Sequence, residues 1–184
     1  FFIGIYDYKF DLNANYRLVI SFLIIFIFLL IDSNFIIKTI RISDKLEIHL
    51  LELSIIFTTF CMAGHIFALN MYDGINLQFG FHLLIVFLFF IFKGILFNFS
   101  LIFILLILVF LYLNYKNKIY MGDSGVYFMG AIISIVYLKN YNNGNLDILE
   151  IITLSLIPII DMFRVIFVRL INGRHPFKKD NFHF

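Results

Sequence analysis

Long apolar segments without charge are the feature that most limits how this chain can fold. From Leu77 to Tyr115 the only Asp, Glu, Lys or Arg residue is Lys93. About 20 consecutive apolar residues cross the hydrocarbon core of a bilayer as a helix, because a helix satisfies its own backbone hydrogen bonds there. Hydrophobic residues make up 62% of the chain and charged residues only 14%, which exceeds what a soluble core needs. The sequence therefore predicts an integral membrane protein.

Polar segments divide the chain into about six spans, preceded by the tail of an earlier one at residues 1–6. The apolar run before Tyr115 is too long for one span, so we expect it to turn near Lys93-Gly94. The fold class is therefore all-α, a polytopic helix bundle that forms a single membrane domain over residues 1–184, as an internal fragment of a larger protein. The predicted spans are approximately 16–31, 53–69, 76–92, 95–115, 124–138 and 148–171.

Residues 40–49 differ from the apolar segments around them. Isoleucine and leucine alternate here with charged and polar residues on both sides of Asp44-Lys45. A period of two indicates strands, so the segment predicts a small hairpin outside the membrane, on the extracytoplasmic side. An amphipathic surface helix is the alternative.

Counting membrane crossings places several polar segments at one end of the bundle. The loops that contain Asp7, Asn70 and Asp123, and the tail after residue 172, alternate with the hairpin, the Lys93 turn and the loop at 139–147. Eight Lys and Arg residues lie at the first end and five at the other. Cytoplasmic loops carry an excess of Lys and Arg, so the first end is predicted to face the cytoplasm.

The polar residues at this end have a chemistry in common. Carboxylate and amide oxygens are hard ligands that suit Mg²⁺, with Mn²⁺ as an alternative, and Mg²⁺ is usually held by one or two carboxylates together with substrate phosphates. Nearby Arg, Lys and His can bind those phosphates and neutralise their developing charge. Long apolar helices can seat a lipid tail. The residues thus favour phosphate transfer between a soluble nucleotide and a membrane lipid, whereas the small net charge of +2 gives no support for nucleic-acid binding.

Four short motifs follow one another in order along the chain. They are Asp7-Tyr8-Lys9-Phe10-Asp11-Leu12, Asn70-Met71-Tyr72-Asp73-Gly74-Ile75-Asn76, Met121-Gly122-Asp123-Ser124-Gly125, and Pro158, Asp161, Arg164, Arg169 and Gly173 with the stretch from Pro176 to His183. Each is weak alone, because Asp and Ser also serve as ordinary helix caps. In this order, over nearly the whole chain, they resemble the polyprenyl-phosphate N-acetylhexosamine-1-phosphate transferases, a family of bacterial glycosyltransferases.

The resemblance implies a reaction. Polyprenyl (undecaprenyl) phosphate attacks the β-phosphate of a UDP-N-acetylhexosamine, and UMP leaves. The tail after residue 172 is most similar to the branch that uses UDP-N-acetylglucosamine. The resemblance further implies a multi-pass protein of the inner membrane, with its active site facing the cytoplasm, that carries out the first membrane step of cell-envelope glycan synthesis. A homodimer is also open.

The resemblance also implies roles for individual residues. Asp7 acts near the lipid phosphate as its base, Tyr120 stacks on the uracil, and Arg17 contacts phosphates. The implied catalytic residues are Asp7, Asp73, Asp123 and His183; the implied substrate-binding residues are Arg17, Asn76, Tyr120 and Arg174; and the implied metal ligands are Asp123 and Asn70.

Departures from the family pattern leave alternatives open. Tyr8 replaces an acidic residue and Leu77 replaces a glycine, so a catalytically degenerate homologue is one alternative. Asp161 and Arg164, three residues apart inside the last span, would mark the path of a transporter, although a structural ion pair is the favoured interpretation. Two further residues have an ordinary role as an alternative to a functional one: Tyr120 as an interfacial anchor and His65 as a packing residue. Counting crossings places His82 at the opposite end from the site.

Overall fold

The computed structural model describes residues 14–43 and 46–173. Most of this part is helical, which agrees with the predicted helical membrane protein. The helices are α2 (Ala14–Ile31), α3 (Ser54–Tyr72), α4 (Gln78–Phe92), α5 (Phe97–Tyr115), α6 (Gly122–Asn142) and α7 (Ile148–Ile171). Three helical segments are long and apolar enough to cross a membrane, namely Leu51–Tyr72, Phe97–Tyr115 and Ile148–Ile171. Helices α2 and α4 are apolar but shorter, and the number of spans stays a prediction.

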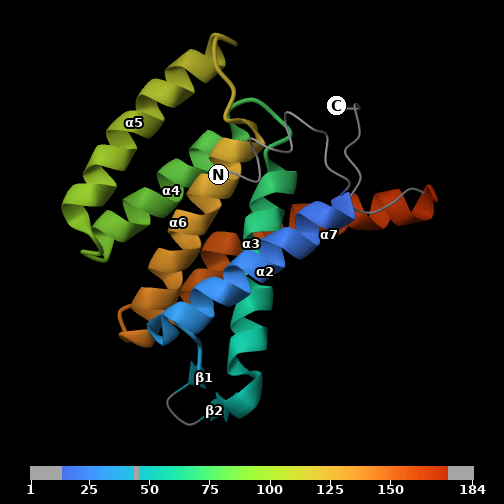
Figure 1. The fold of residues 1–184 in the computed structure, drawn as a ribbon. Helices are drawn as coiled ribbons and strands as arrows, with labels where there is room; N and C mark the ends of the chain where they lie inside the picture. Colours follow the sequence, from blue (N-terminus) through green and yellow to red (C-terminus); the bar gives the residue numbers. More distant parts are fainter. Residues whose placement is uncertain (1–13, 44–45, 174–184) are drawn as a thin grey trace.

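Helix α3 is the centre of the bundle. It packs against α2, α6 and α7, while α4 and α5 form an antiparallel pair on one flank (Figure 1). Small residues permit the close approach of these helices, as is usual in membranes. Gly130 of α6 lies against Ile66 of α3, and Gly80 of α4 lies so close to Leu111 of α5 that a methyl group there would be 2.6 Å from its Cδ2 atom. These contacts hold α6 against α3 and α5 against α4.

Helix α7 runs across the bundle, behind α2 and α3 in Figure 1. Only Ser155 and Pro158 of this helix are buried. Arg164 binds Asp161 through two contacts with the same carboxylate oxygen, 2.9 Å from Nε and 2.8 Å from Nη2. The predicted ion pair is therefore confirmed, and it lies on the outer face of the described bundle, where the Arg164 side chain is 60% exposed.

Two strands, β1 (Thr39–Ser43) and β2 (Leu46–His49), pair antiparallel between α2 and α3. Ile40 faces Ile48 and Arg41 faces Glu47 in the register. This pairing excludes the amphipathic helix that the sequence left open, whereas the position of the hairpin outside a membrane stays a prediction.

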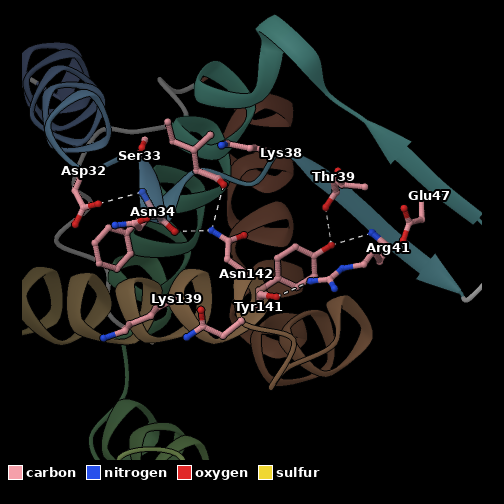
Figure 2. Close-up of a pocket in the computed structure, with 13 residues that line it drawn as sticks. Asp32, Ser33, Asn34, Lys38, Thr39, Arg41, Glu47, Lys139, Tyr141 and Asn142 are labelled. Carbon is pink, nitrogen blue, oxygen red and sulfur yellow. Dashed lines mark hydrogen bonds between the residues drawn. The ribbon is translucent and has the colours of Figure 1, made fainter.

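The last turn of α6 holds the hairpin in place. The Tyr141 hydroxyl donates to the Thr39 carbonyl and accepts from the Arg41 amide, and the Arg41 guanidinium donates to the Tyr141 carbonyl at 2.7 Å (Figure 2). Asn142 donates to the carbonyls of Asn34 and Ile36. Helix α6 continues to Asn142, whereas the sequence predicted a loop from residue 139.

A cavity of about 700 Å³ opens beside this contact. Its charged lining residues are mixed in sign: Asp32, Lys38, Arg41, Glu47 and Lys139. Asp32 accepts from the Asn34 backbone amide (Figure 2), and Glu47 stands opposite Arg41 in the strand register. The Asp32 carboxylate thus has a structural partner, and the cavity lies at the hairpin end of the bundle.

Candidate functional site

At the other end of α3 the structure brings together three helix ends. These are the start of α2, the end of α3 and the start of α6. Arg17 of α2 lies with its Nη1 atom 3.6 Å from Oδ2 of Asp123 on α6. The arginine side chain is only 9% exposed and that of Asp123 is 32% exposed. A helix of 19 residues is about 28 Å long, so this ion pair is far from the hairpin.

Asp123 lies in the first turn of helix α6 and not at its capping position. The helix begins at Gly122, the capping position is Met121, and the Met121 side chain makes no capping hydrogen bond. Gly122 has a φ of +64°, a left-handed conformation that glycine adopts without strain. The Asp123 carboxylate faces Arg17 in this first turn, where the helix dipole also favours negative charge.

The end of α3 contributes a second carboxylate. The helix ends at Tyr72, with Asp73 as its capping residue and Gly74 next. Burial and, to a smaller extent, the negative charge of Asp123 together raise the pKa of the Asp73 carboxyl from its ordinary value of 3.8 to about 7. The two carboxylates are thus close enough to repel one another. A group with a pKa near neutrality is suited to exchange protons or to respond to a cation.

Asn70 lies one turn before Asp73, on the same side of α3. Its Oδ1 atom is buried and accepts no hydrogen bond from the residues that the structure describes. A buried acceptor without a partner is costly, which makes this oxygen a candidate ligand.

These side chains fit Mg²⁺. Asn70, Asp73 and Asp123 supply hard oxygen atoms, and Mg²⁺ needs only one or two carboxylates when substrate phosphates complete its shell. The described residues include no group of three or more His, Cys, Asp or Glu side chains that could enclose a metal on their own. The assignment of Asp123 and Asn70 as metal ligands stays a prediction.

Two loops next to the carboxylates are joined through α5. Asn76 donates from Nδ2 to Oδ1 of Asn117 at 2.6 Å, and the buried Asn114 contacts both loops. Tyr120 is 66% exposed, beside the entrance to α6. Sequence reasoning missed Asn114 and Asn117. An amide near the end of an otherwise apolar helix was the only available signal for Asn114.

Of the two histidines His65 and His82, only His82 lies at a place other than the predicted one. His82 was predicted at the opposite end, yet its ring lies 5.7 Å from that of Tyr72 at the site end of α3. The reason is that His82 follows the Asn76 loop by only six residues and lies near the start of α4. His65 binds Ser134 inside the bundle at 2.9 Å and packs against the ring of Tyr137, which agrees with a packing role.

Several predicted site residues lie outside the described residues. They are Asp7, Arg174 and His183, together with Tyr8, and their roles stay predictions.

The pKa of Asp73 leads to a testable pH dependence. A carboxyl with a higher pKa in the folded than in the unfolded protein stabilises the fold most below about pH 4 and loses this contribution as the pH rises to about 7. We expect the thermal midpoint of the wild type in detergent to fall, relative to Asp73→Asn, between pH 4 and 7 and to run parallel above pH 7. Asp32→Asn, at the hairpin end, is the control. Parallel wild-type and Asp73→Asn curves throughout this range would contradict the raised pKa.

Two neighbouring carboxylates and a buried arginine at one end of a bundle of apolar helices are the features of a helical membrane protein with a polar site. The family model described as glycosyl transferase family 4 matches residues 1–140, and the chain belongs to this family.

Curated relatives agree over a shorter stretch. The undecaprenyl-phosphate alpha-N-acetylglucosaminyl 1-phosphate transferases of Haemophilus influenzae and Pasteurella multocida are each 34% identical to the chain over 70 residues. The match covers 37% of this chain and 20% of each relative. No solved structure matches the chain.

Proposed function

We propose that this protein transfers N-acetylhexosamine 1-phosphate from a UDP-sugar to polyprenyl phosphate and releases UMP. The observation that carries the proposal is the grouping of Arg17, Asp73 and Asp123 at one end of apolar helices. Carboxylates and a buried cation suit a metal-bound diphosphate, while the apolar helices suit a lipid acceptor. The family and the names of the relatives support the same reaction class.

The chemistry is a displacement at phosphorus. An oxygen of the lipid phosphate forms a bond to the β-phosphorus of the UDP-sugar, and the bond from that phosphorus to the bridging oxygen of UMP breaks. When bound, Mg²⁺ neutralises charge on the diphosphate and its leaving group. Arg17, fixed and largely shielded from water, can bind a phosphate oxygen.

The other residues orient the reactants. Tyr120 presents an exposed ring on which uracil can stack, and Asn76 lies in the neighbouring loop. Asp7 is proposed as the base near the lipid phosphate, with Arg174 and His183 as phosphate contacts. UDP-N-acetylglucosamine is the proposed donor and undecaprenyl phosphate the proposed acceptor, in the inner membrane with the site facing the cytoplasm.

The transporter alternative has less support. Its proposed markers, Asp161 and Arg164, lie on the outer face of the described bundle and pair with one another. They do not line a path through its interior.

The test is UMP release by the full-length protein in detergent. The assay contains UDP-N-acetylglucosamine, Mg²⁺ and undecaprenyl phosphate, and each of the three is omitted in turn. We expect UMP only when all three are present. The variant Asp32→Asn, with its carboxylate at the hairpin end, is expected to keep wild-type activity. UMP release without lipid, or none from folded protein with any UDP-N-acetylhexosamine, would contradict the proposal. In the second case, restoration by Tyr8→Asp would point to a degenerate site.

A further inference from the structure

Asn114 occupies an unusual place in the bundle. It lies in the last turn of α5, it is only 4% exposed, and the residues that precede it in the helix are mostly apolar. A buried amide is costly unless both its oxygen and its nitrogen find partners. Its partners therefore show what the residue holds in place.

Both hydrogen bonds of Asn114 end on loops of the candidate site. Its Oδ1 atom accepts from the backbone amide of Leu77 at 2.7 Å, and its Nδ2 atom donates to the backbone carbonyl of Ile119, also at 2.7 Å. Leu77 directly follows Asn76, and Ile119 directly precedes Tyr120. One side chain thus sets the separation of the two residues assigned to the uracil.

The backbone at Leu77 needs such support. Its φ is +73°, a left-handed conformation that strains a residue other than glycine. The hydrogen bond from the Leu77 amide to Asn114 therefore offsets strain that a glycine at this position would not have. Asn117, itself at a φ of +52°, adds a side-chain hydrogen bond to Asn76.

We propose that Asn114 is the positioning residue of the nucleotide-base pocket, which lies between the loop at 74–77 and the segment at 117–120. Its two hydrogen bonds go to the backbone of Leu77 and Ile119, so it acts through the neighbouring Asn76 and Tyr120. The inference rests on the proposed function, because it takes the base of a uridine nucleotide as the ligand.

A matched control exists in the same chain. Asn140 is also a buried amide near a helix end, where its Nδ2 atom donates to the Val136 carbonyl and its Oδ1 atom accepts from Asn145. It lies at the hairpin end, away from the site. Loss of either amide removes two side-chain hydrogen bonds, but of the two only Asn114 contacts the loops of the proposed pocket.

The experiment compares Asn114→Ala, Asn114→Asp and Asn140→Ala in the full-length protein. We measure UMP binding by calorimetry, the KM and kcat for UDP-N-acetylglucosamine, and hydrogen exchange at the Leu77 amide. Asn114→Ala should weaken UMP binding and raise KM by about tenfold, as expected when a pocket loses roughly 1.4 kcal/mol, while kcat at saturation changes less than about threefold. Asn114→Asp keeps the acceptor for Leu77 but not the donor for Ile119, and should fall between.

The outcomes separate the two proposals. Asn140→Ala should leave KM within about twofold even where its thermal midpoint falls as far as that of Asn114→Ala. Equal effects of the two alanine variants on KM, or unchanged exchange at Leu77 in Asn114→Ala, would overturn the positioning role. If the wild type turns over UDP-N-acetylglucosamine but the expected effects of Asn114→Ala are not seen, only the Asn114 inference is refuted. A wild type that neither binds UMP nor releases it refutes the proposed function, and the Asn114 inference with it.

Discussion

Asp123→Asn is expected to lower UMP release by at least about 100-fold, the size seen when one preorganised charge-stabilising group is lost from an active site. Asparagine has the same shape but no charge, so the change removes an anionic ligand at the start of α6 without creating a cavity. It also leaves the buried guanidinium of Arg17 without its carboxylate partner. Steady-state kinetics over a range of Mg²⁺ concentrations would measure the loss.

Two features of the result would separate a catalytic role from general damage. The pKa of Asp73 should fall in Asp123→Asn, because one of the two causes of its upward shift is gone, although burial remains. Excess Mg²⁺ should not restore wild-type kcat. Activity within about threefold of wild type would contradict the assignment of Asp123, whereas equal losses in Asp123→Asn and in the hairpin-end variant Asp32→Asn would indicate unfolding.

The course of the chain could be read from its sequence because membrane helices need long apolar runs. The turn at Lys93-Gly94 follows from length alone, and the structure ends α4 at Phe92 and gives Gly94 a φ of +69°. Counting crossings also placed Asn70, Asp73 and Asp123 at one end. The structure brings the two aspartates together there through helices α3 and α6.

The contacts between elements could not be read in the same way. Helices that are apolar on all sides carry no periodic signal to show which face packs, so small residues such as Gly130 decide the neighbours only once the partner is known. The same limit applies to Tyr141, whose hydroxyl holds a hairpin about 100 residues earlier in the chain. Asn114 escaped notice because its partners are backbone atoms of loops, which leave no trace in residue type.

Arg17→Met is expected to act in two opposite directions. Arg17 carries a buried charge beside Asp123, and the same guanidinium is proposed to bind a substrate phosphate. Methionine fills a similar volume without charge. Because a fixed cation no longer competes for the Asp123 carboxylate, Mg²⁺ alone should bind roughly three- to tenfold more tightly, on the order of one pKa unit of charge coupling. UMP release should nevertheless fall by about 100-fold or more, since the phosphate loses its cation.

Arg17→Lys is the matched variant, because it keeps the charge but loses the planar fork that binds oxygens in pairs. Mg²⁺ affinity in this variant should stay near that of the wild type, while turnover is reduced to an intermediate degree. Titration of each detergent-solubilised protein with Mg²⁺ in the absence of nucleotide, followed by kinetics, measures both effects. Tighter metal binding with full activity would restrict Arg17 to a counter-ion for Asp123. Lower activity with unchanged metal binding would mean that the contact at 3.6 Å does not compete with the metal.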